Sequence, residues 1–352
     1  MNNVSFIDRH MTNILKGIAV IFMFVHHMFT FPRWYIDSIS YPELKDFASF
    51  FCSPFKLCVG MFAFLTGYSY FFTKDKKLRY SLRKISLFLI RYWSIYIPLL
   101  ILASVLGCYK FQLMDFMLEL FALKRPIMCF CWYVYFYIVA MLILPLLIGL
   151  TRNNPIGFAL GGIVVINYLC SLLLQCLADD IARNVVSDFR TWFPCIVIGY
   201  LFAQLDIYHR IFETTTKLIK SKCVLVIFWT AMVVISFVSR HYNAYQNIGK
   251  ISWWDWHLNL RINMDIIYVP IFIYGVVKLI KLIPFERPLH ILSELGKYSP
   301  YMWFWHCIFF NVCKEYTQHI LYFLKLPLLV TIWGICICYI LSRIWGKSII
   351  QV

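Results

Sequence analysis

Apolar stretches long enough to cross a lipid bilayer recur along this whole chain. Hydrophobic residues make up 61% of it and charged residues 14%, whereas soluble domains carry about 25% charged residues. A membrane-spanning helix needs about 20 apolar residues, and we predict such spans at 13–31, 51–73, 84–107, 127–150, 156–177, 191–206, 222–239, 262–283, 298–313 and 325–345. Lipid offers the backbone no hydrogen bonds, so each span must satisfy its own. The pattern predicts an all-α, polytopic membrane helix bundle of about ten transmembrane helices.

The predicted spans and their connecting loops account for all 352 residues. We therefore expect one transmembrane domain over 1–352, with no appended soluble domain. The first span contains Lys16, His26 and His27 and is followed by no small-residue cleavage site, which argues against a cleaved signal peptide. These features predict a multi-pass protein of the cell (inner) membrane whose helices themselves carry any chemistry.

Basic residues indicate how the chain is oriented in the membrane. The connection KDKKLRYSLRK holds six basic residues and one acid between Lys74 and Lys84. Because Lys and Arg are enriched in cytoplasmic loops, this connection favours a cytoplasmic location for both termini, as an even number of spans requires. The net charge of +16 is spread over loops and helix ends, so we expect no nucleic-acid binding.

Cysteines are numerous, but their spacing indicates neither metal nor redox chemistry. The chain has thirteen cysteines, most of them inside predicted spans, and no CxxC pair. We expect them to act as small apolar side chains and expect no metal site. Cys129 and Cys131 are the one pair whose spacing merits inspection.

Lys16 and His27 occupy the two ends of one apolar run, LKGIAVIFMFVHHMFTF. Eleven residues return a helix to within about 20° of its starting direction, so both side chains share a face, about 16 Å apart along the axis. His26 points about 100° away. Ionisable groups inside a membrane are expensive and often functional, although Lys16 could also be a snorkelling anchor and His27 a hydrogen-bonded packing residue.

Two further ionisable side chains lie well inside predicted spans. Arg91, in SLFLIRYWSIYIP, sits about 10 Å into the third span, and His306, in KYSPYMWFWHCIFF, about 12 Å into the ninth. Arg91 could reach back to the cytoplasmic surface. If it faces the bundle, it extends the basic connection inward and could hold a phosphate or a carbonyl.

The outer side of the bundle offers weaker candidates. Arg190 and Asp265 lie near the outer ends of their spans, where structural pairing or simple exposure is the better interpretation. Trp254 belongs to an aromatic group before the eighth span. Such a group is typical of a membrane interface, and its aromatic faces could also stack on sugar rings.

Several of these segments, taken together and in order, resemble the acyltransferase-3 family of bacterial membrane proteins. The first helix of that family carries Arg or Lys, ten residues and then His, as in LKGIAVIFMFVHHMF. MFAFLTGYSYFF resembles the family's second helix, and the basic run through Arg91 to IYIP resembles its third. CWYVYFYIVAMLILPLL resembles its Trp-aromatic stretch, and we take Trp132 in this segment as an acceptor-side candidate. FPCIVIGYLFAQ and LGKYSPYMWFWHCIFF resemble later segments, the second including the family's histidine. The matches extend from residue 13 to about 310.

One feature departs from the family pattern. Its third helix often carries two arginines three residues apart, but here Ser94 follows Arg91 at that spacing. Either Arg83 or Lys84 supplies the second charge from lower in the helix, or this chain does without it.

The resemblance implies O-acyl transfer, most often of acetyl, from cytoplasmic acyl-coenzyme A to a hydroxyl of a carbohydrate. Acyl-CoA would be a co-substrate, and no permanently bound cofactor is expected. Lys16, Arg91, Arg83 and Lys84 would bind the donor, whose phosphates suit the basic cytoplasmic face. His27 would act as general base or carry the acyl group itself, and His306 would orient a reactant.

The leading alternative is a transporter or flippase for glycans or lipid-linked sugars. Such a protein also needs polar groups at mid-membrane and could use His27 and His306 as a proton relay. The sequence shows neither a repeat between its halves nor a pair of Gly/Pro-broken helices, which favours the acyltransferase.

Overall fold

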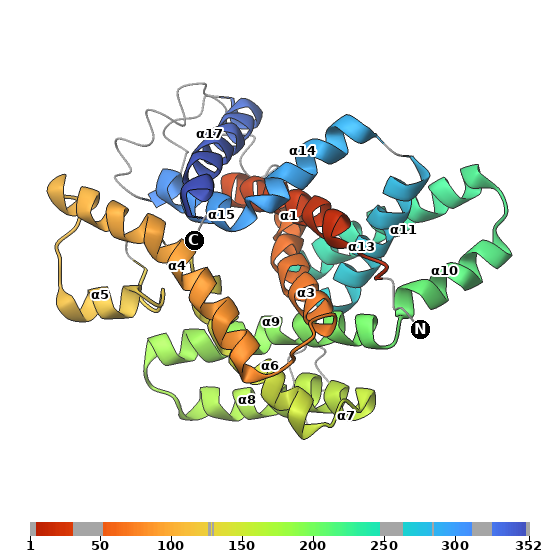
Figure 1. Ribbon diagram of the computed structural model, residues 1–352, viewed down its shortest axis with the longest axis horizontal. Coiled ribbons are helices and arrows are strands. Elements are labelled where there is room, and N and C mark those ends of the chain that lie inside the picture. Colours follow the sequence, from red (N-terminus) through yellow and green to blue (C-terminus); the bar gives the residue numbers. More distant parts are fainter. Residues whose placement is uncertain are drawn as a thin grey trace. The chain divides into compact units, whose positions relative to one another are not determined.

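The computed structural model describes residues 5–30, 52–125, 128, 130–246, 263–283, 285–311 and 326–349. Across those ranges the secondary structure is helical and contains no strand (Figure 1), which confirms the all-α prediction. The elements in chain order are α1 (Arg9–Thr30), η3 (Ser53–Lys56), α3 (Leu57–Phe71), α4 (Leu78–Val105), α5 (Leu113–Glu119), α6 (Tyr133–Leu150), α7 (Pro155–Ala159), η4 (Leu160–Val165), α8 (Ile166–Cys176), α9 (Asp180–Gln204), α10 (Ile207–Leu218), α11 (Lys222–Gln246), α13 (Asp265–Leu282), α14 (Glu286–Lys297), α15 (Ser299–Asn311) and α17 (Pro327–Ile349).

Seven helical stretches within the described ranges are long and apolar enough to cross a membrane. They are Arg9–Phe29, Leu78–Val105, Tyr133–Leu150, Pro155–Cys176, Asp180–Gln204, Lys222–Tyr242 and Leu328–Lys347. The other three predicted spans correspond to α3, α15 and α13. Helices α3 and α15 have 15 and 13 residues, respectively, and α13 carries three charged side chains in its 18 residues. A polytopic helical bundle is therefore supported, and the count of ten stays a prediction.

The sixth span begins earlier than the sequence pattern predicted. We placed it at 191–206, but α9 begins at Asp180 and contains 25 residues. The Asp179 carboxylate accepts a hydrogen bond from the backbone N–H of Ala182 at 2.7 Å, and this capping satisfies one of the free N–H groups at the start of the helix. Hydropathy alone misses such a start because the first turns of α9 are polar.

The chain divides into two compact units that alternate along the sequence. Unit 1 comprises residues 1–19, 53–77 and 143–297, and unit 2 comprises residues 20–52, 78–142 and 298–352. Helices α1 and α6 each contribute residues to both units. Each unit is described by itself below.

In unit 1, α3 and α9 approach so closely that their backbones touch. A Cβ atom added to Gly67 of α3 would lie 1.9 Å from the carbonyl oxygen of Ile196, and one added to Gly199 of α9 would lie 2.1 Å from the carbonyl oxygen of Phe64. Each helix thus presents a glycine to the other's backbone. Small residues permit this kind of approach in membrane proteins, where packing replaces the hydrophobic effect between helices.

Helices α1 and α14 of unit 1 meet in the same way. A Cβ on Gly17 would lie 2.0 Å from the carbonyl oxygen of Leu292, and a Cβ on Gly296 would lie 1.8 Å from that of Asn13. Gly17 directly follows Lys16, so this contact fixes the part of α1 that carries the lysine. On the other side of the unit, α8 and α9 pack side by side (Figure 1).

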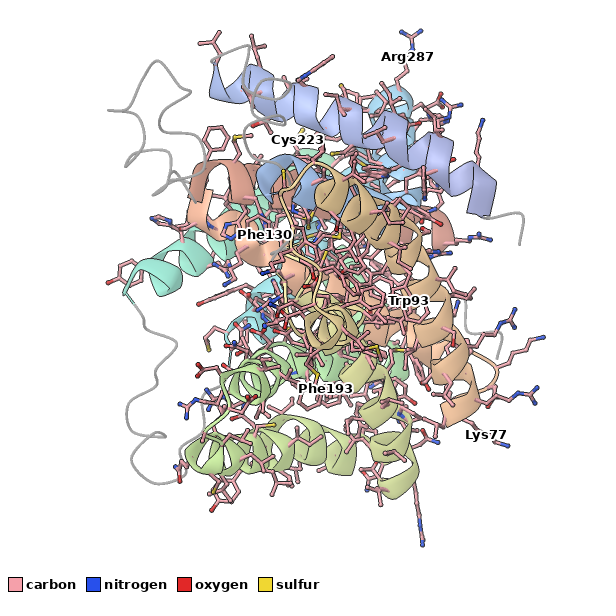
Figure 2. The ribbon with its side chains drawn as sticks, turned by 90° about the vertical axis from the view of Figure 1, so that its left-hand side faces the viewer. Lys77, Trp93, Phe130, Phe193, Cys223 and Arg287 are labelled. Atoms are coloured by element: carbon pink, nitrogen blue, oxygen red, sulfur yellow. The ribbon has the colours of Figure 1, made fainter. Side chains whose placement is uncertain are left out.

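In unit 2, α15 packs against both α4 and α17. The Trp345 indole N–H of α17 donates to the Ser94 hydroxyl of α4 at 3.3 Å, and the Trp345 ring meets that of Trp305 on α15 edge-on at 5.8 Å. Trp93 of α4, labelled in Figure 2, donates its indole N–H to the carbonyl oxygen of Leu120 at 2.7 Å. The segment after α4 is thereby tied back onto that helix.

A buried carboxyl group strengthens this connection between α4 and α5. Glu119 is 1% exposed, and its carboxylate accepts hydrogen bonds from the hydroxyls of Tyr96 and Tyr109, the latter at 3.0 Å. The hydroxyl of Tyr92 donates to the Glu119 carbonyl oxygen at 2.9 Å. Burial raises the pKa of Glu119, while the two tyrosine hydroxyls act in the opposite direction. The protonated acid is thus favoured in the folded protein.

We predict that Gly67→Ala destabilises the protein by about 1–3 kcal/mol, because the new methyl group must displace the backbone of α9. Melting of the detergent-purified protein measures the effect. Gly149→Ala is the matched control, since a Cβ there meets no atom within 4 Å and alanine is favoured over glycine in a helix. A Gly67→Ala protein that melts with wild type would contradict the close approach.

We predict that Glu119 makes the protein less stable as the pH rises. A carboxyl whose folded pKa lies above its unfolded value contributes stability that is complete below about pH 4.5 and lost as the pH passes the folded pKa. Melting temperatures between pH 5 and 8 should therefore fall in wild type and vary less in Glu119→Gln. Glu286→Gln, the same exchange at an exposed acid at the start of α14, should keep the wild-type slope. If the melting temperatures of wild type and Glu119→Gln depend equally on pH, Glu119 is not the source of the pH dependence.

Candidate active site

The imidazole rings of His27 and His306 meet inside unit 2. His27 lies in the last turn of α1 and His306 on α15. Their ring centroids are 4.9 Å apart, and His306 Nε2 lies 3.4 Å from His27 Nδ1. The two histidines predicted to carry chemistry are thus brought together across 279 positions of sequence.

When both rings are neutral, the contacts of the pair favour one tautomer of each histidine. His306 Nδ1 is hydrogen-bonded to the carbonyl oxygen of Trp303, and because a carbonyl only accepts, Nδ1 must carry the proton. In the neutral ring His306 Nε2 is then an acceptor, so His27 Nδ1–H donates to it. The lone pair of neutral His27 consequently resides on Nε2, the nitrogen turned away from its partner. A neutral His27 in this tautomer can accept a proton only at Nε2.

Aromatic side chains enclose the histidine pair. Phe130, labelled in Figure 2, packs edge-on against the His27 ring at 4.0 Å and stacks with His306 at 5.8 Å. Phe24 contacts His306 at 5.6 Å. His306 is 0% exposed, whereas His27 is half-buried. The more accessible ring is therefore the one whose Nε2 holds the lone pair.

Two cysteine thiols lie beside the pair. Cys131 Sγ and Cys307 Sγ are 3.5 Å apart, and Cys307 Sγ is 3.8 Å from His306 Nδ1. Both thiols are buried and free. The sequence analysis treated these cysteines as filler and chose Cys131 with Cys129 as the pair to inspect; Cys129 lies outside the described residues. Only the fold could show Cys307 as the neighbour, because it is 176 positions away.

Arg91 points toward the helix that carries His306. Its guanidinium carbon lies 5.9 Å from the centre of the Tyr301 ring on α15, and Arg91 is half-buried. Tyr301 precedes His306 by five residues, which is about 7.5 Å along a helix axis. Five residues also turn a helix by about 140°, so Arg91 and the imidazole pair contact different sides of α15.

The remaining donor-side candidates are placed differently. Arg83 and Lys84 are exposed on the first turns of α4, and the Lys84 ammonium lies 5.4 Å from the ring centre of Tyr80 on the same helix. Both lie more than a turn of helix before Arg91. Lys16 is half-buried and belongs to unit 1, at the contact between α1 and α14.

The acceptor-side candidates are divided between the two units. Trp132 lies in unit 2, next to Cys131, and packs against Tyr133 at 5.9 Å. Arg190 lies on α9 in unit 1 and donates from Nη1 to the Ser171 hydroxyl at 3.1 Å. Trp254 lies outside the described residues. Asp265, in unit 1, is taken up by an ion pair.

Arg240 is the partner of Asp265, and the sequence analysis did not identify it. Arg240 Nε lies 3.0 Å from Asp265 Oδ1, and Nη2 donates to Oδ2 at 3.3 Å. Arg240 also donates to the carbonyl oxygen of Ser53 at 3.4 Å, and the Ser53 hydroxyl is hydrogen-bonded to His241 Nδ1 at 3.0 Å. Gly60 of α3 lies close to the helix that carries Asp265, because a Cβ there would lie 2.6 Å from Val269 Cγ2. An arginine just past one span and an acid opening the next are the signal that could have revealed it.

Comparison with known proteins gives one match that covers nearly the whole chain. The family model for acyltransferase 3, described as an acyltransferase domain, matches residues 10–343. No curated protein and no solved structure matches the chain. The family match spans both units and includes all of the candidate site residues. The chain therefore belongs to the acyltransferase-3 family and is a multi-pass membrane acyltransferase.

Proposed function

We propose that the protein transfers an acyl group, most simply acetyl, from cytoplasmic acyl-CoA to a hydroxyl of a surface carbohydrate or glycan precursor in the cell membrane. Membership of the family supports acyl transfer. The observation that carries the proposal for the site is the pair of His27 and His306, whose ring nitrogens lie 3.4 Å apart. An acceptor hydroxyl needs such a base, since at neutral pH it is a poor nucleophile.

The reaction replaces the C–S bond of the thioester with a C–O bond and moves the hydroxyl proton to the thiolate. His27 Nε2 takes the hydroxyl proton as the oxygen attacks the thioester carbonyl, and the C–S bond then breaks to release the thiolate of coenzyme A, which takes that proton. Alternatively, His27 Nε2 attacks the thioester and expels the thiolate of coenzyme A. The hydroxyl then takes the acyl group from the ring, and its proton passes to that thiolate. In both routes positive charge develops on His27, and the acceptor lone pair of His306 Nε2 stabilises it through Nδ1–H.

Arg91 is suited to the donor side of the reaction. A guanidinium binds phosphate or polarises a carbonyl through paired N–H groups, and the Tyr301 contact places Arg91 along the helix that carries His306. In the predicted orientation this is the cytoplasmic side, from which acyl-CoA would come. Lys16, Arg83 and Lys84 would add positive charge to the same face.

We predict that His27→Ala lowers kcat by about 10²–10⁴-fold, the usual contribution of general acid–base catalysis. The assay follows labelled ester formation by purified protein with acetyl-CoA and a glycan acceptor. The variant should elute and melt like wild type, and His10→Ala, an exposed histidine on α1, should retain full activity. A well-folded His27→Ala enzyme with normal turnover would refute the assignment.

The role of His306 can be separated from mere packing by a pair of substitutions. The side-chain carbonyl of His306→Gln can still accept the His27 Nδ1–H, whereas His306→Phe cannot. We expect His306→Phe to lose much more activity than His306→Gln and to shift the pH of half-maximal activity. Equal losses in the two variants, with unchanged pH profiles, would show that His306 is structural.

We predict that Arg91→Gln raises the KM for acyl-CoA by about tenfold, because a charged hydrogen bond contributes about 1.5–3 kcal/mol. Steady-state kinetics with varied donor and saturating acceptor measure it. Arg287, which points outward at the start of α14 in Figure 2 and is exposed, offers the control Arg287→Gln with the same loss of charge. An unchanged donor KM in Arg91→Gln would remove Arg91 from the donor site.

The same assay distinguishes an enzyme from a carrier. Detergent-solubilised enzyme forms a covalent ester, whereas a transporter or flippase needs a sealed membrane and leaves its substrate unmodified. If folded protein that binds the donor forms no ester, the result favours a transporter or flippase.

A further inference from the structure

Unit 1 contains a cavity of about 430 Å³ that has no role in the chemistry above. Its volume lies within the range of small-molecule sites, about 300–1,000 Å³. The residues that give it chemical character are Phe6, His209, Thr215, Trp229, Lys278 and Lys281. They come from the segment before α1 and from α10, α11 and α13, so the cavity is built from four parts of the sequence.

One wall of the cavity is basic. Lys278 and Lys281 are three residues apart on α13, so their side chains share a face of that helix. Lys278 is buried with 5% of its surface exposed, and Lys281 is exposed. His209 adds a ring nitrogen and lies 2.5 Å from the Asp206 carboxylate through Nδ1. None of the residues lining this cavity is an acid, so the lining favours an anion.

Aromatic rings lie directly beside the two lysines. The Lys281 and Lys278 ammonium groups lie 4.3 Å and 5.1 Å from the centre of the Phe6 ring. Lys281 also donates to the Phe6 carbonyl oxygen at 3.5 Å. Trp229 meets Tyr274 edge-on at 4.8 Å, and Tyr274 stacks with Phe6 at 5.4 Å. The cavity therefore combines cations with flat apolar surfaces, which suits a ligand that has both a phosphate and an apolar or ring portion.

The predicted topology places this cavity at the cytoplasmic surface. The segment before α1, the connection between the sixth and seventh spans and the end of the eighth span all lie on that side in the orientation derived from the sequence. A ligand would thus enter from the cytosol or from the headgroups of the inner leaflet. Lysines at the end of a span are common there, but anchoring alone requires neither a cavity nor the polar groups of His209 and Thr215.

We propose that this cavity binds a phosphate ester that carries an aromatic or apolar group. Lys278 and Lys281 would bind the phosphate, and the rings of Phe6 and Trp229 would contact the rest of the ligand. If the proposed function holds, the nucleotide end of acyl-CoA supplies this chemistry. The headgroup region of an anionic phospholipid supplies the same chemistry from the membrane. Both sources require the two lysines, and the ring contact distinguishes them.

The test uses the full-length protein in phosphatidylcholine nanodiscs. Adenosine 3′,5′-bisphosphate, inorganic phosphate and adenosine are the soluble probes, and phosphatidylglycerol added to the nanodisc is the lipid probe. Affinity is measured by titration, and thermal stabilisation is recorded alongside it. We expect the bisphosphate to bind wild type more tightly than inorganic phosphate does if the source is a nucleotide. If the source is lipid, phosphatidylglycerol should stabilise wild type instead.

Charge and ring variants identify the site. Lys278→Gln with Lys281→Gln should weaken binding of the effective probe by about tenfold or more, and Trp229→Leu should weaken the bisphosphate but not inorganic phosphate. Lys222→Gln, an exposed lysine at the start of α11, removes one charge from the same predicted face without lining the cavity and should bind normally. If the double variant does not fold, Lys281→Gln alone and the charge-preserving Lys278→Arg take its place. Equal responses of wild type and the lysine variants to every probe would overturn the proposal.

Failure of the cavity can be told apart from failure of the proposed function. Binding is measured on His27→Ala protein as well, where no turnover is expected and the probe should still bind. If the lysine variants form the ester with an unchanged donor KM and bind the probes as wild type does, the proposed ligand site is refuted and the proposed enzyme function is retained. If wild type binds a probe through the two lysines but forms no ester, the proposed ligand site is retained and the proposed transfer from acyl-CoA to a glycan is refuted.

Discussion

Backbone-to-backbone contact between helices is the constraint on which unit 1 depends. Gly67 and Gly199 allow α3 and α9 to touch, and Gly17 and Gly296 do the same for α1 and α14. Between apolar helices in lipid there is little hydrophobic driving force, so close packing must provide the attraction. These contacts leave no room for a methyl group, and the second of them fixes the part of α1 that carries Lys16.

Polar groups in the bundle are held in pairs that join distant parts of the chain. Glu119 is bonded to tyrosines of α4 and of the loop after it, Asp265 to Arg240 of the preceding helix, and His27 to His306. An unpaired polar group is costly in an apolar environment, so each partner restricts where the other can go. In the histidine pair the same restriction also sets the direction of proton donation, and structure and chemistry there rest on the same hydrogen bonds.

Some elements could be predicted from the sequence and others could not. Each predicted span overlaps helical segments of the described residues, because apolar runs in lipid can satisfy their backbone hydrogen bonds only in that form. The amphipathic helices α5, α10 and α14 were not predicted, since they are too short or too polar to produce a hydropathy signal. The polar start of α9 was missed for the same reason.

The sequence by itself determined the helical membrane fold, its family, and the presence of imidazoles and an arginine at depths where such groups are expensive. Only the tertiary structure decided that His306 accepts from His27, that Cys307 lies beside Cys131, that Arg240 neutralises Asp265, and that Lys278 and Lys281 line a cavity with Phe6. Periodicity along one helix gives the direction of a side chain but not its partner. The partner depends on which helices pack together, and that is decided by contacts between residues far apart in the chain.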